Sequence, residues 1–578
     1  MTTKFKKIVS ITLFLMIMLV TVPVSASSAS EKTADGFKYI PLSGTTAKIT
    51  GAVKVSETLN IPSKLGGYTI TEICEKAFYH YGDLDKLTLP NTLKKIGEKA
   101  FQDCWIEKGL VIPDSVVEIG THAFDFGVEG DLKLGKNLEK IGAYAFGFSV
   151  IKSVVIPDKV KNLDYVFSDS SIDHLTLGKN SNLSEKGIKE LISDGFSVIK
   201  QIDVPKENPN FTTKDGVLFN KGMTKLILFP SSKQTKKYKI PQTVTKLYKN
   251  SFPSAKIDTI VFSDNLKKYN AAFSGNNIKT FMLGKNTPKP ENIHDTFVLY
   301  GVESINVPEG NPYMDSVDGV LYDDGAKKLL MYPYNKAGKT YNMPNTVTSI
   351  GEFALALTKN LNYINFSDSL KTIGENAFRT NRSIVELTLP DSLRTIEKEA
   401  FFASPIAITL NNGLEKIGAR AFKFCSKFKT LTIPNSVKEV GNCAFDYCMN
   451  LESLKVENPA TILRHGAFAD CSNLKSARIS YACGGHTFAR CTSLKNVEIP
   501  EGVELLGKTE FFRDELGGSI TIPATVKKIN AKCVGFDGYK KSGKTIYTKF
   551  KGFKIKGYKG TAAESYAKKY GFKFVALD

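Results

Sequence analysis

The sequence predicts a β-rich solenoid, in which short parallel strands from repeat units of about 20–24 residues stack on one another. Three observations predict this fold class. One apolar pattern recurs along almost the whole chain, each copy contains a short stretch of alternating apolar and polar residues, and no copy can bury its apolar side chains alone. The solenoid is expected to carry two β-hairpin insertions and a short C-terminal capping helix.

The repeat unit is clearest at residues 87–104. It begins with Leu87-Thr-Leu89-Pro90 and continues with Leu93-Lys-Lys-Ile96-Gly97, Ala100-Phe101 and Cys104. The phenylalanine marks the register, and its copies are spaced as in leucine-rich repeats. The equivalent phenylalanines are Phe78, Phe101, Phe124, Phe146, Phe167, Phe252, Phe273, Phe297, Phe378, Phe401, Phe422, Phe445, Phe468, Phe488 and Phe511.

Each part of the unit has a physical interpretation. In Leu431-Thr-Ile433-Pro434 the alternation predicts a strand with one buried face, and the proline ends the strand because it cannot donate to a ladder. Glycines such as Gly97 and Gly441 permit a tight corner, and Ala-Phe fills the interior of the coil. Stacked units should therefore form a parallel sheet with the phenylalanines close together, closed by a cap at each end.

The N-terminus predicts export. Lys4, Lys6 and Lys7 precede an apolar run from Ile8 to Val24, and small residues follow, so we expect a signal peptide cleaved after Ala26, with an uncleaved N-terminal anchor as the alternative. No transmembrane span is expected in the mature chain, which would be secreted or held at the cell surface.

Removing the three lysines of residues 1–26 leaves a net charge of 20 − 3 = +17. This excess favours anionic wall polymers over nucleic acid as partners, although a solvated basic surface without a specific partner is an open alternative.

Two segments interrupt the period and are duplicates of each other. Asn208-Pro209, Asp215-Gly216-Val217-Leu218-Phe219 and Tyr238-Lys-Ile240-Pro241 reappear as Asn311-Pro312, Asp318-Gly319-Val320-Leu321-Tyr322 and Tyr341-Asn-Met343-Pro344. Each predicts a β-hairpin that projects from the coil, with turns at Lys221-Gly222 and Asp324-Gly325.

A stray helix is expected from Ser184 to Gly195. Thr561-Ala-Ala-Glu564 predicts a capping box that opens a helix ending at Gly571, and Lys573 to Ala576 should close the sheet.

These features predict eight segments along the chain. They are a signal peptide at 1–26, an N-terminal cap region at 27–70, repeats at 71–207, 242–310 and 345–545, hairpin insertions at 208–241 and 311–344, and a C-terminal cap at 546–578.

The Leu-x-Ile-Pro, Val-x-x-Ile-Gly, Ala-Phe-x-x-Cys unit resembles the BspA-type leucine-rich repeat of bacterial and protist surface proteins. The duplicated insertion and the tail that begins Gly560-Thr-Ala-Ala-Glu564 are similar to the same family. The resemblance covers roughly residues 37–578. It implies a leucine-rich-repeat solenoid, and it implies attachment to host matrix proteins, other cells or surfaces.

The cysteines are the first candidates for a chemical site. Cys104, Cys425, Cys448, Cys471 and Cys491 all lie three residues after a register phenylalanine, so at least the last four should stack on successive coils. We expect small buried hydrophobic residues, with disulfides between adjacent coils or a metal site as alternatives. The other cysteines, Cys74, Cys443, Cys483 and Cys533, occupy irregular positions.

No pattern of catalytic residues stands out from the repeat. Cys443 and His465 occupy nearly equivalent places in consecutive units and could approach one another, but no orienting group accompanies them, so chance neighbours are the favoured interpretation. We therefore expect no enzyme activity, no cofactor and no metal. Loss of an activity on mutation of Cys443 or His465 would support the alternative of a hydrolase.

The outward positions of the predicted strands are the candidate binding surface, because solenoids bind through extended faces. The alternative is that threonine is simply a good exposed-strand residue. The hairpin aromatics are further candidates, with core packing as their alternative. The candidate residues are Thr88, Thr176, Glu386, Thr388, Thr409, Thr432, Lys455, Arg478, Glu498 and Thr521, with Tyr322 and Tyr334 from the second hairpin; Phe219, Phe229 and Tyr332 are the other hairpin aromatics.

The sequence therefore predicts adhesion or ligand binding at an extended solenoid surface, with an extracellular protein or glycan as the partner. The alternative is a wall-associated structural scaffold that its positive charge retains without a specific ligand.

Overall fold

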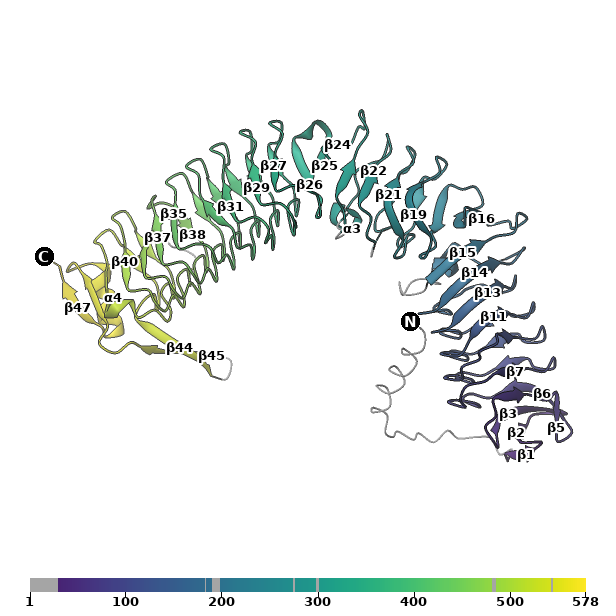
Figure 1. Cartoon of the computed structure of the whole chain (residues 1–578). Helices are drawn as coiled ribbons and strands as arrows, with labels where there is room; N and C mark the ends of the chain where they lie inside the picture. Colours follow the sequence, from purple (N-terminus) through teal and green to yellow (C-terminus); the bar gives the residue numbers. More distant parts are fainter. Residues whose placement is uncertain are drawn as a thin grey trace. The chain divides into compact units, whose positions relative to one another are not determined.

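The computed structural model describes residues 30–577 except for 182, 190–197, 274–275, 298–300, 481–484 and 542–543. The predicted signal peptide, residues 1–26, lies outside the described residues. The chain divides into two compact units, Met1–Ser149 and Val150–Asp578. Both are parallel β-solenoids whose strands follow one another in chain order (Figure 1), as the repeat predicts. No helix among the described residues is long and apolar enough to cross a membrane.

The first unit begins with an antiparallel meander, β1 (Lys32–Ala34), β2 (Phe37–Pro41) and β3 (Thr46–Ala52). Strand β3 then pairs in parallel with β6 (Tyr68–Ile73), so the meander covers the first coil. The parallel ladder continues through β8 (Lys95–Ile96), β10 (Glu118–Ile119) and β12 (Lys140–Ile141). The other strands of this unit are β4 (Thr58–Asn60), β5 (Lys64–Leu65), β7 (Lys86–Thr88), β9 (Leu110–Val111) and β11 (Glu129–Lys133).

The strands of the second unit outside its hairpins form two series of short parallel strands, and many coils contribute one strand to each series. We call the outward surface of the longer series the strand face. We call the shorter series the second sheet. The strand face comprises β13 (Val150–Ile156), β14 (Ser171–Leu177), β15 (Val198–Asp203), β19 (Gln234–Lys239), β21 (Lys256–Val261), β22 (Thr280–Met282), β23 (Ser304–Asn306), β27 (Thr340–Asn342), β29 (Tyr363–Asn365), β31 (Glu386–Thr388), β33 (Ala407–Thr409), β35 (Thr430–Ile433), β37 (Ser453–Val456), β39 (Ser476–Arg478), β40 (Asn496–Glu498), β42 (Ser519–Thr521), β46 (Lys554–Gly557) and β47 (Lys573–Ala576). The second sheet comprises β20 (Lys246–Leu247), β28 (Ser349–Ile350), β30 (Thr372–Ile373), β32 (Thr395–Ile396), β34 (Lys416–Ile417), β36 (Glu439–Val440), β38 (Ile462–Leu463), β41 (Leu505–Leu506) and β43 (Lys528–Ile529).

The Ala-Phe segment closes each coil and supplies a stack of rings along the solenoid. Phe401 lies 5.1 Å from Phe422, and Phe422 lies 4.9 Å from Phe445, measured between nearly parallel ring centroids. The Phe422 backbone N–H donates to the Ala444 carbonyl of the next coil at 2.7 Å. These rings are fully buried, so hydrophobic burial and a hydrogen bond between coils act at the same register position.

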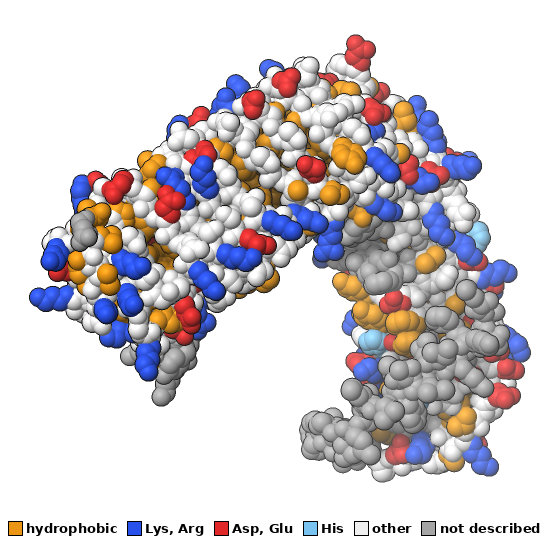
Figure 2. Space-filling view, turned by 60° about the vertical axis from the view of Figure 1, so that its left-hand side comes forward, with side chains coloured by type: hydrophobic (Ala, Val, Ile, Leu, Met, Phe, Trp, Pro, Cys, Tyr) orange, Lys and Arg blue, Asp and Glu red, His pale blue; other side chains and the backbone are white. Residues whose placement is uncertain are grey.

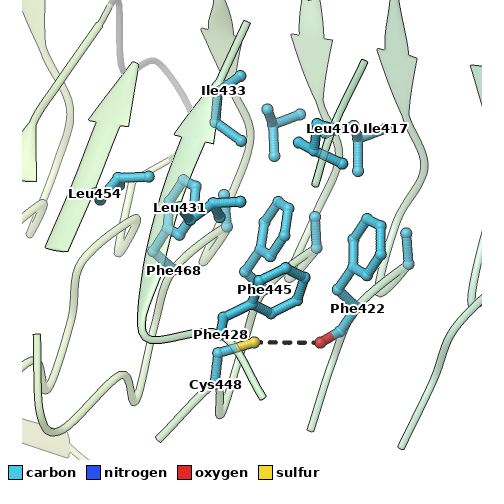
Figure 3. Close-up of a cluster of buried hydrophobic side chains, with 14 of the residues drawn as sticks. Leu410, Ile417, Phe422, Phe428, Leu431, Ile433, Phe445, Cys448, Leu454 and Phe468 are labelled. Carbon is cyan, nitrogen blue, oxygen red and sulfur yellow. Dashed lines mark hydrogen bonds between the residues drawn. The ribbon is translucent and has the colours of Figure 1, made fainter. Parts of the chain in front are cut away.

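The cysteine ladder is confirmed, and each thiol also has a hydrogen-bonding role. The Cys448 Sγ donates to the Phe422 carbonyl of the preceding coil at 3.2 Å (Figure 3), beside the buried Leu431 and Phe428. Cys425, Cys471 and Cys491 make the equivalent bonds to Phe401, Phe445 and Phe468 at 3.1, 3.3 and 3.2 Å. The eight described cysteines are free thiols, and Cys483 lies outside the described residues.

Both insertions contain the predicted antiparallel hairpin, but the expectation that the hairpins project from the coil is wrong. The first contains β16 (Phe211–Lys214), β17 (Val217–Asn220) and β18 (Lys225–Leu228). The second contains β24 (Met314–Val317), β25 (Val320–Asp323), a 3-10 turn η2 (Asp324–Ala326) and β26 (Lys328–Met331). Strands β18 and β26 join the second sheet by parallel pairing with β20 and β28. The hairpins lie in the core because their apolar residues occupy both faces; Phe219, Phe229, Tyr322 and Tyr332 are all buried.

The helices are few and short. Helix α2 (Glu185–Lys189) begins the predicted stray helix, whose residues 190–195 lie outside the described residues. Helix α3 (Ile293–Phe297) belongs to a later coil. The predicted C-terminal helix is present as α4 (Ala562–Tyr570), with Gly571 as its left-handed C-cap at φ 64°.

The C-terminal end closes the sheet as predicted, because β47 pairs in parallel with β46. The expected capping box is not formed. The Glu564 carboxylate accepts from the Gly560 N–H at 2.7 Å, whereas the Thr561 hydroxyl donates to the Tyr558 carbonyl at 2.6 Å and caps no helical N–H. A 3-10 turn η3 (Leu516–Gly518) and a further antiparallel hairpin, β44 (Phe536–Lys541) with β45 (Lys544–Lys549), precede this end.

Candidate binding surface

The strand face of the second unit carries side chains in straight rows, because parallel pairing keeps equivalent residues opposite one another. Thr388 is opposite Thr409 on β31 and β33. Thr432, Lys455 and Arg478 follow one another on β35, β37 and β39. Arg478 is in turn opposite Glu498 on β40. The structure therefore brings these predicted candidates into one register position of the strand face.

The remaining strand candidates occupy related places. Glu386 belongs to a second row two residues earlier in the strand, where it is opposite Ala407. Thr521 is exposed and is opposite Lys556 on β46. Thr176 is half-buried between Val155 and Asp203. Thr88 lies in the first unit, where it is exposed and opposite Asn60 of β4.

The second row of the strand face is also hydroxyl-rich. Thr430, Ser453 and Ser476 occupy consecutive register positions, and the Ser476 hydroxyl donates to that of Ser453 at 3.3 Å. Together with the threonines of the first row, these residues present small hydrogen-bonding groups on a flat strand surface. Such a surface offers many separate weak contacts to an extended ligand.

Between β31 and β40 the charge on the strand face is concentrated on β37 to β40 and is largely paired within the protein. The Arg478 guanidinium donates to Glu498 Oε1 at 2.9 Å and to the Val456 carbonyl at 2.9 Å, so it links neighbouring coils. Lys455 lies 3.2 Å from Glu457 of its own coil. Figure 2 likewise shows acidic side chains among the lysines and arginines of the visible face.

The two tyrosine candidates of the second insertion have different environments. Tyr322 is completely buried, and its hydroxyl lies 2.6 Å from that of Tyr341, so it belongs to the core and not to an accessible surface. Tyr334 is half-buried and lines a groove of about 550 Å³. Phe353 and Leu357 of the next coil line the same groove, and Leu357 is 42% exposed.

This groove is the feature of the site that sequence reasoning missed. Lys289, Glu291 and Asn292 line it from the loop before α3, and the second insertion supplies the opposite wall. Its residues come from segments far apart in the chain. The available signal was the degenerate repeat in which Leu355 replaces the register phenylalanine, beside the insertion.

The geometry at Cys443 does not favour nucleophilic chemistry. Its backbone N–H donates to the His465 carbonyl at 2.9 Å, which confirms that the two residues are neighbours on consecutive coils. Burial raises the pKa of the Cys443 thiol, whereas an activated nucleophile needs a lowered pKa. Among the described residues, no group of three His, Cys, Asp or Glu side chains is placed to hold a metal ion.

The repeat itself identifies the protein's family. A model of the BspA type leucine rich repeat region matches residues 57–188, 225–314, 334–407 and 405–484, in six copies. The chain belongs to the BspA-type leucine-rich repeat family. Members of the BspA-type family typically act as binding scaffolds at the cell surface or after secretion. No curated protein matches the chain.

Several solved structures resemble this BspA-type chain. A leucine-rich repeat protein from Eubacterium ventriosum is 16% identical, with 83% of this chain and 93% of that chain covered and a TM-score of 0.31. A leucine rich cell surface protein from Faecalibacterium prausnitzii is 17% identical, with coverages of 82% and 96% and a TM-score of 0.23. The pneumococcal vaccine antigen PcpA is 18% identical, with coverages of 82% and 99% and a TM-score of 0.29. At these identities and scores the likenesses carry no argument about function.

Proposed function

We propose that the chain is a secreted or cell-surface protein that acts in adhesion or ligand binding through its strand face. The observation that carries the proposal is the register of β31 with β33 and of β35 with β37, β39 and β40, in which polar side chains from successive coils occupy equivalent outward positions. A rigid row of this kind suits an extended partner, an extracellular protein or a glycan, that makes repeated contacts of similar chemistry.

The groove beside the second insertion supplies the specificity in this proposal. Tyr334 and Phe353 provide aromatic surface, while Lys289 and Glu291 provide charges of both signs. Aromatic side chains with a polar edge are frequent anchors of protein interfaces. A loop or side chain of the partner would enter the groove while the rest of the partner lies along the strand face.

A binding role is proposed in place of a catalytic one. Burial raises the pKa of the Cys443 thiol, which disfavours its use as a nucleophile. The ion pair between Arg478 and Glu498 holds these two side chains in place on the strand face. Export rests on Lys4, Lys6 and Lys7 before the apolar run that ends near Ala26.

The experiment is a binding array. Residues 27–578 are applied to matrix proteins, glycans and isolated wall polymers at low and at physiological ionic strength. The proposal requires a saturable signal that survives the higher salt, because screening removes attraction between exposed charges. A signal confined to anionic polymers and abolished by salt would refute the adhesion role. Point variants are the means of locating the site, because β17, β18, β25 and β26 are buried and deleting an insertion would disrupt the core.

A further inference from the structure

The first insertion interrupts the strand face and leaves a cavity beside an exposed strand. Among the described strands, β19 pairs with β21 alone, so its other edge faces the insertion. A cavity of about 510 Å³ lies between β19 and the turn at Lys214 and Asp215. A second cavity of about 450 Å³ adjoins it, because Thr235 lines both. We call these two cavities together the lysine groove.

The lysine groove has a strong excess of positive charge. Lys214, Lys233, Lys237 and Lys239 line the first cavity with Asp215 as its single carboxylate. Lys236 and Lys256 line the second with Asp258, which already lies 3.8 Å from Lys279. All six lysines are at least partly exposed, and within the described part of the chain none has a carboxylate oxygen within 4 Å of its ammonium group.

Some lysines elsewhere in the solenoid pair with an acid on the neighbouring coil. Lys438 lies 2.6 Å from Glu415, and Lys475 lies 2.6 Å from Glu452. Coil-to-coil pairing of that kind compensates charge and gives the ammonium a fixed partner. The lysines of the groove lack such partners, so their charge is available to a ligand.

The second insertion shows that the fold shared by the two insertions does not require all of these lysines. Its strands β24, β25 and β26 have the same lengths and pairing as β16, β17 and β18. In the duplicated sequence Val317, Thr340 and Asn342 take the places of Lys214, Lys237 and Lys239. The one lysine retained at the first cavity, Lys336 in place of Lys233, is neutralised by Asp318 at 2.9 Å. Lys339 takes the place of Lys236 and keeps its charge. The same scaffold therefore exists within one chain with more and with fewer lysines beside it.

We propose that the lysine groove binds an anionic polysaccharide, a linear glycan with repeated carboxylate or sulfate groups. Several ammonium groups along two adjoining cavities match repeated charges on a chain better than a single ion, and lysine binds such groups as a point charge with little directional demand. Thr235, Gln242 and the half-buried Tyr238 lie among the lysines and offer hydrogen-bonding and ring contacts to sugar units. The groove has no row of exposed rings on which successive nucleic-acid bases could stack.

This inference is independent of the proposed role of the strand face from β31 to β40, since it concerns different residues. It also identifies where an anionic polymer would be held. Attraction by the net charge alone would act over the whole surface. Binding of a polyanion in the groove depends on the six lysines that line it. Attraction by the net charge depends only on the total number of charged side chains.

The substitutions in the test are taken from the sequence of the second insertion. The groove variant Lys214→Val, Lys237→Thr, Lys239→Asn introduces the residues that the chain already uses at the equivalent places. The control variant Lys371→Thr, Lys416→Thr, Lys429→Thr removes the same charge from exposed lysines elsewhere in the second unit. The variant Lys237→Thr, Lys239→Asn, confined to the exposed β19, is the second groove variant if the triple variant does not fold.

Binding is measured by titration calorimetry against heparin octasaccharide, oligogalacturonate and an oligo-dT strand at several salt concentrations. We expect the groove variant to bind the anionic glycan at least about tenfold more weakly and with a salt dependence shallower by about two to three charges. The control should stay within about twofold of the unmodified protein. Heparin and oligogalacturonate distinguish sulfate from carboxylate as the preferred group. Equal losses in the groove and control variants, or preferential binding of oligo-dT, would overturn the proposal.

Discussion

The Tyr566 hydroxyl accepts a hydrogen bond from the Val534 backbone N–H at 3.2 Å and donates one to the Val534 carbonyl at 3.0 Å. Val534 occupies the register position that phenylalanine holds in other coils, and it is fully buried. In those coils the backbone N–H at this position donates to the next coil, as Phe511 does to Cys533. Helix α4 therefore supplies, through one side chain, a partner that a further coil would otherwise provide.

Replacing Tyr566 with Phe should destabilise the C-terminal end. The change leaves two buried backbone groups of Val534 without a partner, at a cost of about 1–3 kcal/mol. Chemical denaturation measures the cost, and hydrogen exchange should show lost protection near Val534. Tyr558→Phe, at a side chain that is 39% exposed, is the matched control and should have little effect. Equal stability of the two variants would contradict the capping role of Tyr566.

The stability of the same region should fall as pH rises from about 4.5 to 7. Glu510 is fully buried where other coils place alanine, such as Ala444 and Ala467, and burial raises its pKa to about 7 from an ordinary 4.5. Because the folded state then binds the proton more tightly than the unfolded state, ionisation of Glu510 lowers the free energy of unfolding by about 3 kcal/mol once the pH exceeds 7.

Glu510→Ala should therefore raise the denaturation midpoint at pH 8 more than at pH 4.5. Thermal melts of the variant and the unmodified protein at the two pH values measure this difference. Glu504→Ala is the control, since Glu504 is exposed and paired with Lys527. A Glu510→Ala variant whose gain in stability is independent of pH would contradict the assignment.

The cysteine ladder should tolerate serine better than alanine. Ser404 already donates to the Phe378 carbonyl from the equivalent position, so Cys448→Ser keeps a donor for the Phe422 carbonyl. We expect Cys448→Ser to change the free energy of unfolding by less than about 1 kcal/mol and Cys448→Ala to lower it by about 1–2 kcal/mol. Denaturant titration measures both. The thiol should also resist alkylation in the folded protein, because burial raises the pKa of Cys448 well above its ordinary value.

The parallel stack and the cysteine ladder could be predicted because both depend on spacing alone. Residues separated by one repeat must lie on neighbouring coils, as Phe422 and Phe445 do. The turn around the rings could not be predicted. Glu399 and Ala403, on either side of Phe401, both have φ near 55°, a conformation that neither residue type favours. Hydrogen bonds to the next coil, such as that from the Phe401 N–H to the Ala421 carbonyl, hold the chain there.

The candidate site was predicted only where it follows the repeat. The rows of the strand face follow from alternation, and the structure aligns Thr432 with Lys455 and Arg478. The grooves could not be predicted, because they combine an insertion with coils that precede or follow it. The sequence does contain a signal that the hairpins are buried. Val217-Leu218-Phe219 is apolar without interruption, which is typical of a strand covered on both faces.

Whether the strand face is the binding surface is decided by repeating the binding array with two matched variants of neighbouring coils. Thr388→Arg, Thr409→Arg places two long charged side chains on the strand face, and Thr372→Arg, Thr395→Arg places the same pair on the second sheet. We expect a saturable signal at physiological salt that the strand-face variant loses and the second-sheet variant keeps. Equal signals from the two variants would contradict the claim that the strand face is the binding surface.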